Sequence, residues 1–156
     1  MYKLDKVSKL SASQLNTVAT ILNKCGKDMA QKYDLHHWDN QHIKSLIIVI
    51  ICSLKNEIYL ISDEIEPVAT FMTQKRGSIL HFEKLGTLPS KSGKGIGSLC
   101  MTKIEEIAKS AGCKKVSMEV YAASEHAISF YEHRGYTVVG TTDTLKYKEV
   151  KMEKGI

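Results

Sequence analysis

The sequence has few cysteines, and none of them stands in a metal-binding pattern. The four cysteines of this 156-residue chain are Cys25, Cys52, Cys100 and Cys113. No C-x-x-C pair occurs, and no cysteine stands at zinc-ligand spacing from a histidine. We therefore expect no metal site, and we expect reduced, mostly buried thiols in a cytoplasmic protein.

Long apolar runs and blocks of like charge are also missing. The most apolar stretch, residues 46–52, is far too short to span a bilayer, and residues 1–5 lack the apolar segment of a signal peptide. Lysines are interleaved with acids throughout the chain, although the net charge is +5. We therefore expect neither a membrane nor a nucleic acid as partner. The modest positive potential suits an anionic small molecule.

The chain contains no internal repeat or low-complexity segment that would divide it. Its length and ordinary composition, 43% hydrophobic and 25% charged, predict one globular domain over residues 1–156. Hydrophobic periodicity predicts strands at 2–10, 57–62, 67–74, 79–87, 115–121, 136–141 and 145–152, and helices at 11–32, 40–54, 98–111 and 124–134. The last two strands offer an edge for a second copy, so monomer and homodimer both stay open.

Several local signals support these helices. Ser11 and Gln14 have the spacing of a capping box, whereas Ser124 and Asp39 are candidate N-caps. Gly26 falls inside the first helix and predicts a mild defect or kink. The β-branched residues 46–51 favour a buried strand, but the length and context of 40–54 favour a helix.

A glycine-rich stretch, residues 88–99, joins the strand at 79–87 to the helix at 98–111. Gly93, Gly95 and Gly97 can adopt positive φ and let a ligand approach the backbone. The helix start that follows offers unpaired N–H groups and the positive end of the helix dipole. With Lys91 and Lys94 beside it, the loop has the properties of a phosphate-binding cradle.

Two common phosphate-binding motifs do not fit this loop. A P-loop has Lys and Ser/Thr directly after its last glycine, whereas Ser98 and Leu99 follow Gly97. A dinucleotide-binding loop needs G-x-G-x-x-G, and counting from Gly95 puts Cys100 at the third glycine. Without further evidence, the alternative is a turn that only connects two elements.

Two blocks of sequence resemble the GCN5-related N-acetyltransferases. S-G-K-G-I-G at 92–97 is similar to that family's pyrophosphate loop, Gln/Arg-x-x-Gly-x-Gly/Ala, with Ser92 where Gln or Arg is usual. M-E-V-Y at 118–121, F-Y-E at 130–132 and G-Y at 135–136 are similar to its segment ending in F-Y-E-x-x-G-F, with Ser124 where Asn is usual. The resemblance covers the chain from about Leu80 onward. It implies an α/β (α+β) fold with a mixed, mostly antiparallel central sheet flanked by helices, in the order βααβββαβαββ.

The resemblance also implies acetyl-CoA as co-substrate, with no metal. Loop N–H groups would hold the pyrophosphate, the main chain of Leu85 and Thr87 would pair with the pantetheine arm, and Ser124 and Tyr131 would complete the cofactor site. The loop residues concerned are Ser92, Gly93, Lys94, Gly95, Ile96, Gly97 and Ser98.

Acyl transfer from a thioester to an amine needs a base for the amine and benefits from a proton donor for the thiolate. By resemblance, Tyr131 is the donor, and a phenol with an ordinary pKa of about 10 suits this task. Glu83 and Glu119 are both candidate bases. The alternatives are a packed core tyrosine, and strand carboxylates that pair with lysines such as Lys84 or Lys115.

Residues 33–40 form a polar–aromatic loop between the first two helices. His36 and Trp38 in this loop are candidate acceptor-binding residues, together with His81 on the strand at 79–87. The alternative is that Trp38 fills the core and the histidines are simply exposed. By resemblance, loops at this position shape the acceptor pocket, but no motif here identifies the acceptor.

The sequence thus predicts an acetyl-CoA-dependent N-acetyltransferase that acts on a primary amine of a small molecule or protein. The predicted mechanism is direct attack in a ternary complex, with a glutamate base and Tyr131 as acid. The alternative is a non-catalytic acyl-CoA-binding or sensor protein of the same fold.

Overall fold

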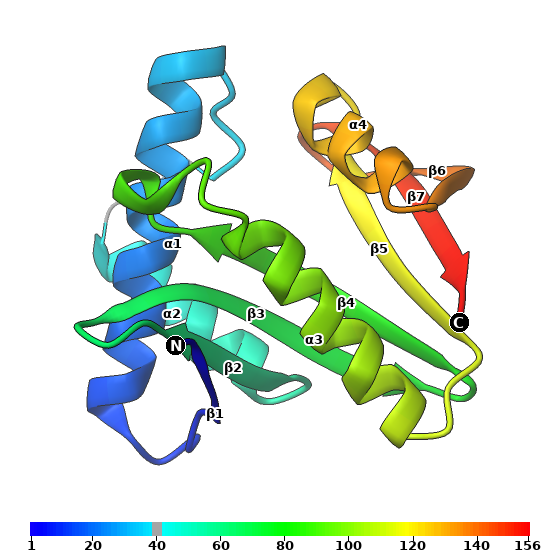
Figure 1. The fold of residues 1–156 in the computed structure, drawn as a ribbon. Helices are drawn as coiled ribbons and strands as arrows, with labels where there is room; N and C mark the ends of the chain where they lie inside the picture. Colours follow the sequence, from blue (N-terminus) through cyan, green and yellow to red (C-terminus); the bar gives the residue numbers. More distant parts are fainter. Residues whose placement is uncertain (39–41) are drawn as a thin grey trace. The chain divides into compact units, whose positions relative to one another are not determined.

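The computed structural model describes residues 1–38 and 42–156 of the chain (Figure 1). Its elements are β1 (Lys3–Lys6), α1 (Ala12–Tyr33), α2 (His42–Ser53), β2 (Glu57–Ser62), β3 (Pro67–Arg76), β4 (Ile79–Thr87), the short 3₁₀ helix η1 (Pro89–Lys91), α3 (Ile96–Ser110), β5 (Lys115–Tyr121), α4 (Glu125–His133), β6 (Thr137–Asp143) and β7 (Lys148–Gly155). The cap predicted at Asp39 and the helix start predicted at Asn40 lie outside the described residues.

The predicted order of helices and strands is confirmed, with η1 added before α3. The strands form a seven-stranded sheet in the order β1-β2-β3-β4-β5-β7-β6. β4 and β5 run parallel, whereas β1–β2, β2–β3, β5–β7 and β6–β7 are antiparallel pairs. The mixed, mostly antiparallel sheet that the resemblance implied is therefore confirmed.

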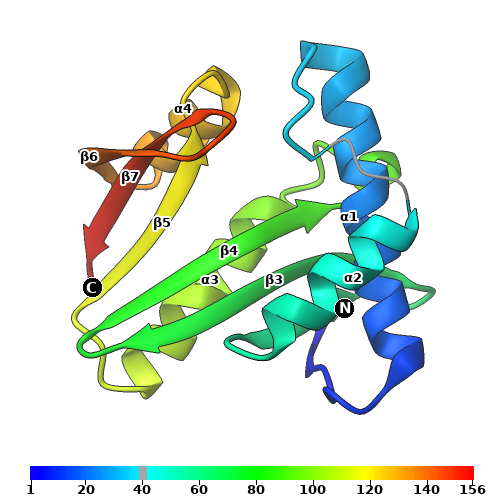
Figure 2. The same cartoon turned by 180° about the vertical axis from the view of Figure 1, so that it is seen from behind.

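The chain divides into two compact units, of which the first contains Met1–Gln74 and Lys84–Lys103. In this unit α1 and α2 lie against one face of the strands, the face turned toward the viewer in Figure 2. Its core is apolar and consists of Val7, Leu15, Val18, Ala19, Ile21, Leu22, Cys25, Val49, Ile58, Leu60, Met72 and Leu88.

The second unit contains Lys75–Glu83 and Ile104–Ile156. α4 lies in front of the β6–β7 hairpin in Figure 1 and behind it in Figure 2, so this helix covers one face of these strands. Buried side chains of this unit include Leu80, Phe82, Ile104, Ala108, Val116, Met118, Tyr131, Tyr136 and Met152. The single domain over residues 1–156 stays a prediction.

Helix α1 begins where its N-cap was predicted. The Ser11 side chain accepts a hydrogen bond from the Gln14 N–H. Gln14 does not complete a capping box, however, because its side chain accepts from the Ser8 N–H instead (2.8 Å). The helix continues without interruption past Gly26 to Tyr33, so the defect predicted at that glycine is absent.

Helix α2 settles the ambiguity between helix and strand in favour of the helix. Ser45, Val49 and Ser53 are buried at four-residue spacing, which is the period of one helix face. The opposite face is apolar but exposed, through Ile47, Ile50 and Ile51. Packing of one face overrides the strand preference of β-branched residues. In the described parts of the chain, no helix has both the length and the apolar character needed to cross a membrane.

Some predicted boundaries shift in the structure. β1 covers only Lys3–Lys6 of the predicted 2–10, because the cap of α1 follows closely, and α3 begins at Ile96 rather than 98. Ser124 occupies the N-cap position of α4, as predicted, although its side chain makes no capping hydrogen bond. Tyr136, predicted to open a strand, is instead buried before β6 begins.

Candidate active site

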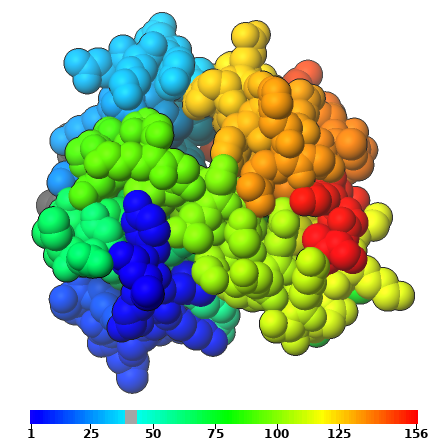
Figure 3. Space-filling view, viewed as in Figure 1, coloured from blue at the N-terminus to red at the C-terminus, as the bar shows by residue number. Residues whose placement is uncertain are grey.

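The glycine-rich loop lies between η1 and α3, within the first unit. Gly93 has φ 76° and Gly95 has φ 77°, in the left-handed region that favours glycine. A Cβ on either glycine would meet nothing within 4 Å, so the backbone conformation, and not lack of room, requires glycine. Ser92, Lys94 and Ser98 are exposed, and atoms of this loop, coloured lime green, lie on the surface in Figure 3. The loop therefore presents accessible main chain directly before a 15-residue helix.

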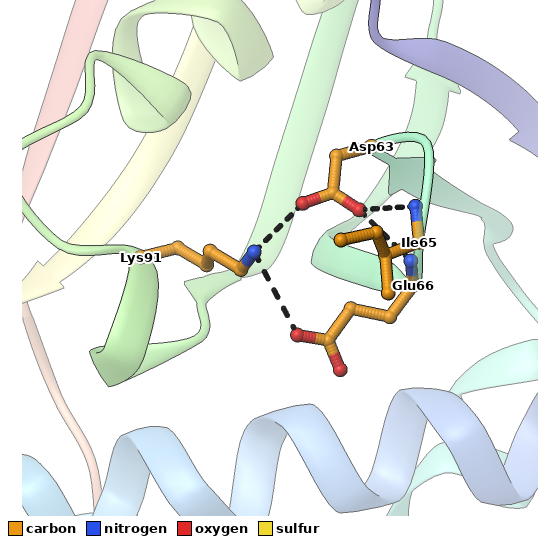
Figure 4. Close-up of polar contacts among 4 residues, drawn as sticks. All are labelled: Asp63, Ile65, Glu66 and Lys91. Carbon is orange, nitrogen blue, oxygen red and sulfur yellow. Dashed lines mark hydrogen bonds and ion pairs between the residues drawn. The ribbon is translucent and has the colours of Figure 1, made fainter.

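Lys91 does not contribute free positive charge to the loop as the sequence suggested. Its ammonium donates to Asp63 Oδ2 at 2.8 Å and lies 3.8 Å from Glu66 Oε1 (Figure 4). Asp63 Oδ1 in turn accepts from the N–H groups of Ile65 and Glu66. The Lys91 hydrogen bond and these N–H groups lower the pKa of Asp63 well below its ordinary range. Lys91 thus ties η1 to the β2–β3 turn, and Lys94 is the exposed lysine of the loop.

The main chain of β4 just before the loop is held tightly against α1. The Cys25 thiol donates a hydrogen bond to the Thr87 carbonyl (3.0 Å), and burial raises the pKa of this thiol to about 12. A Cβ at Gly86 would lie 3.0 Å from Cys25 Sγ and 3.3 Å from Leu22 Cδ2. The close approach of α1 therefore favours glycine at position 86, and the Cys25 hydrogen bond ties the end of the strand carrying Leu85 and Thr87 to α1.

Trp38 occupies a defined position in the loop after α1. The Lys84 ammonium lies 5.5 Å from the centre of the Trp38 ring, close enough for a cation–π interaction. A Cβ at Gly26 would lie 1.9 Å from the Trp38 carbonyl oxygen, so this glycine makes room for the backbone of the loop. Lys84 itself has φ 54°, an unusual value for a residue other than glycine inside a strand.

Both interpretations of Trp38 describe part of its environment. Its half-buried ring packs against the core of the first unit. It also lines a hollow together with Leu22, Ser45, Ile48 and Lys84. His36 is exposed, and its Nε2 lies 2.7 Å from Asp34 Oδ1. The structure therefore places Trp38, but not His36, on the wall of this hollow.

In the second unit, the structure brings together His81 and Glu119. The buried imidazole of His81 is hydrogen-bonded through Nδ1 to Ser117 Oγ (3.0 Å), and its Nε2 lies 3.4 Å from Glu119 Oε2. Burial, and then the nearby Arg76, lower the pKa of His81 from 6.5 to about 4. The ring is therefore neutral near neutral pH.

The two candidate bases have different surroundings. Glu119 contacts His81, whereas Lys115, one of the lysines considered for pairing with it, forms its ion pair with Glu153 (3.4 Å). Glu83 follows His81 by two residues on β4, so both side chains lie on the same face of that strand. The left-handed residue Lys84 then interrupts the alternation that would otherwise place Leu85 on that face as well.

Tyr131 lies on α4 within a group of aromatic rings. Its ring centre is 5.9 Å from that of Phe82, 5.2 Å from Phe130 and 6.1 Å from Tyr136. Tyr136 follows α4 and donates a hydrogen bond to Glu105 (3.2 Å), which also accepts from Lys154 (3.1 Å). The hydrogen bonds among Tyr136, Glu105 and Lys154, together with the aromatic contacts of Tyr131, stabilise the position of α4 within the second unit.

Three features of these sites were not found by sequence reasoning. Ser117 was missed because its contact with His81 depends on the register of β4 against β5. The close packing at Gly26 was missed because it involves Trp38, which is distant in sequence. The left-handed conformation of Lys84 has no residue-type signal. Within the described residues, no group of three or more His, Cys, Asp or Glu side chains is placed to hold a metal ion.

Known proteins share this architecture. The chain is similar to the ribosomal-protein-S18-alanine N-acetyltransferase from Escherichia coli, with 14% identity, a TM-score of 0.74, and coverage of 100% of this chain and 94% of that one. It is also similar to the PaiA N-acetyltransferase from Thermoplasma acidophilum in complex with coenzyme A (18% identity, TM-score 0.75, coverage 100% and 99%). A third similar structure is an aminoglycoside 6′-N-acetyltransferase complexed with coenzyme A (15% identity, TM-score 0.71, coverage 98% and 96%). The TM-scores show a shared fold, and at such low sequence identity the similarity shows no more than the fold.

A family model adds evidence from the sequence itself. The model described as the acetyltransferase (GNAT) family matches residues 16–136, which is more than half of the chain. The match includes the glycine-rich loop, both candidate bases and Tyr131. This chain therefore belongs to the GNAT acetyltransferase family.

Proposed function

We propose that this protein transfers the acetyl group of acetyl-CoA to a primary amine of a small molecule or a protein. The observation that carries the proposal is the loop at 92–98. Its two left-handed glycines and exposed main chain precede α3 at the position where the family binds its cofactor. The net charge of +5 is compatible with an anionic cofactor.

The loop fits a pyrophosphate in its chemistry. The N–H groups of residues 93–98 are the donors that we assign to the phosphates, because the first N–H groups of a helix have no partner within the helix. The Ser92 N–H instead donates to the Pro89 carbonyl (3.1 Å). Ser92 replaces a longer polar side chain, so binding relies on the main chain and on Lys94. We assign the main chain of Leu85 and Thr87 to the pantetheine arm, and Ser124 to the cofactor site as well.

Bound acetyl-CoA supplies an activated acetyl thioester. Glu119 or Glu83 takes a proton from the acceptor ammonium, so that the neutral amine can form a bond to the acetyl carbon. A backbone N–H donates to the acetyl oxygen as negative charge develops there. Tyr131 gives its phenolic proton to the sulfur as the carbon–sulfur bond breaks. The nitrogen loses its second proton as the amide forms, a proton from the site restores the Tyr131 phenol, and the glutamate releases its proton to water. The products are an amide, free CoA and one proton.

We propose the acceptor only as a chemical class, a primary amine of a small molecule or a protein. Two of the similar structures are enzymes named for an alanine of a ribosomal protein and for an aminoglycoside, which are amines of different size. In this chain the hollow beside Trp38 and Lys84, within the first unit, is the acceptor-binding surface that we assign.

Amine-dependent release of CoA tests this function. The full chain is incubated with acetyl-CoA and, separately, with a polyamine, an aminoglycoside and a peptide with a free N-terminal alanine. Free thiol is measured against a blank that contains the protein, since the chain has four thiols of its own. Acetylation of at least one amine, confirmed by mass, supports the enzyme. Binding of acetyl-CoA without transfer to any of them favours the non-catalytic acyl-CoA-binding alternative.

A further inference from the structure

His81 lies at the point where the pairing of β4 with β5 ends. The described register joins Ile79 to Lys115, Leu80 to Val116 and His81 to Ser117. His81 is therefore the last β4 residue in this parallel ladder. Registered residues of neighbouring strands project to the same face, and Glu119 follows Ser117 by two residues on that face. The His81 imidazole thus contacts Ser117, its partner on β5, and also Glu119, the next β5 residue on the same face, which lies beyond the paired part of the two strands.

The polar contacts of His81 indicate its tautomer: Nδ1 is hydrogen-bonded to Ser117 Oγ, and Nε2 lies 3.4 Å from Glu119 Oε2. A carboxylate can only accept, so the contact with Glu119 requires the proton on Nε2. A neutral ring then has a bare Nδ1, which accepts from the Ser117 hydroxyl. Because Ser117 is 3% exposed and His81 is 1% exposed, water has little access to compete for the hydrogen bond between them. In this tautomer Ser117 donates to Nδ1, and the Nε2–H faces the Glu119 carboxylate.

The charge state of this ring follows from all the groups that act on it. Burial, Arg76 of β3 and Lys151 of β7 lower the pKa of His81 to about 4, whereas Glu83 of β4 acts in the opposite direction. Near neutral pH the ring is therefore a neutral donor to Glu119 and not the cation of an ion pair. The Glu119 side chain is 31% exposed, so a proton can reach it from outside.

We propose that His81 is a positioning residue for acetyl transfer, which holds the Glu119 carboxylate through Nε2–H and makes Glu119, rather than Glu83, the base. This inference rests on the proposed function and deepens it. A glutamate on a strand has several rotatable bonds, and binding one carboxylate oxygen to a buried ring restricts them. The other oxygen is left to take the acceptor proton, directly or through a water.

The tautomer gives a test that does not depend on the acceptor. In ¹⁵N-labelled wild-type protein near neutral pH, the His81 ring is identified by its loss in His81→Gln. We expect a protonated Nε2 and an unprotonated Nδ1, and a shift of the Nε2–H resonance in Glu119→Gln. Protonation on Nδ1, or a cationic ring near neutral pH, would overturn the proposal.

Kinetics on an amine that the wild-type protein acetylates give the second test. We expect Glu119→Gln to lower kcat by roughly 100-fold or more, as loss of a general base does. We expect His81→Leu to lower kcat by roughly 10- to 100-fold, with the KM for acetyl-CoA changed by less than about two-fold. In Glu119→Gln protein, adding His81→Leu should change kcat by less than about two-fold, because His81 acts through Glu119.

Two further variants separate positioning from a purely structural role. His81→Gln keeps an N–H near the position of Nε2 and should recover much of the activity that His81→Leu loses. Val116→Ala removes a buried side chain from the opposite face of β5, so it should lower stability but leave kcat within about two-fold. Equal losses of kcat in His81→Leu and Val116→Ala, or multiplicative effects of His81→Leu and Glu119→Gln, would overturn the inference. A wild-type protein that binds no acetyl-CoA would instead overturn the proposed function.

Discussion

The loop at 92–98 and the cluster of His81, Ser117 and Glu119 show two ways of building a functional site. The loop is exposed, and its main chain is shaped by two left-handed glycines. In the cluster, His81 and Ser117 are buried and share a hydrogen bond across two strands, and the His81 ring lies 3.4 Å from the exposed Glu119 carboxylate. We therefore expect changes in the loop to affect binding of acetyl-CoA, and changes in the cluster or at Tyr131 to affect turnover.

The largest expected effect is a fall in kcat, without loss of acetyl-CoA binding, in Tyr131→Phe. Tyr131→Phe keeps the ring and its aromatic contacts but removes the phenolic proton, so kcat should fall by roughly 100-fold or more. The Kd for acetyl-CoA should change by less than about two-fold, because the ring keeps its packing. Tyr59→Phe, in which the altered ring stacks on Phe71, is the matched control and should keep full kcat. An unchanged kcat in Tyr131→Phe would remove this residue from the mechanism.

The next effect concerns stability and follows from the buried His81. The folded chain takes up a proton at His81 only near pH 4, whereas the ordinary pKa is 6.5, so the unfolded state binds more protons between these values. The free energy of unfolding should therefore fall as the pH decreases through this window, by on the order of 3 kcal/mol from this group.

Urea unfolding of wild-type protein and of His81→Gln, at about pH 7 and about pH 4.5, measures this contribution. His81→Gln should lose less stability on acidification, because its unfolded state has no such proton to bind. Equal losses in the two proteins would show that the ring is not held neutral by the fold.

A smaller effect is expected from the backbone of the loop. Gly95→Ala places a Cβ on a residue with φ 77°, which costs about 1–2 kcal/mol in this conformation or shifts the loop out of it. The affinity for acetyl-CoA should therefore fall by about 10-fold. Gly77→Ala is the control, since Gly77 has φ 62° and equally open surroundings but lies in the β3–β4 turn. Similar affinity losses in both variants would show that general strain, and not the loop geometry, weakens binding.

The smallest effect distinguishes the two lysines near the loop. Lys94 is exposed, so Lys94→Ala should reduce affinity for acetyl-CoA by less than about five-fold, with the loss disappearing at high salt. Lys91→Met should leave the salt dependence of affinity unchanged, because Asp63 and Glu66 already neutralise its charge. A stronger salt effect from Lys91 than from Lys94 would reverse this assignment.

The sequence predicted those features that depend on local residue types. The bounds of β2, β4 and β5 agree with the predicted strands, and Gly93 and Gly95 adopt the positive φ for which glycine was singled out. Ser11 caps α1 as expected, since capping involves residues only three apart. The order of elements followed from periodicity and from the resemblance together.

Features that depend on distant residues were not predictable in the same way. The pairing of Lys91 with Asp63 and the packing of Gly26 against Trp38 each join segments that are adjacent only in the folded chain. For the same reason, the sequence could not choose between Glu83 and Glu119. That choice depends on His81 and Ser117, which lie on neighbouring strands.

Calorimetric titration of the purified chain with acetyl-CoA tests the central claim most directly, with ATP and NAD as control ligands. We predict binding of acetyl-CoA with a Kd in the micromolar range, about −8 kcal/mol, and no comparable binding of either control. Absence of acetyl-CoA binding, or equal binding of ATP, would contradict the assignment of the 92–98 loop to this cofactor and the enzyme function built on it.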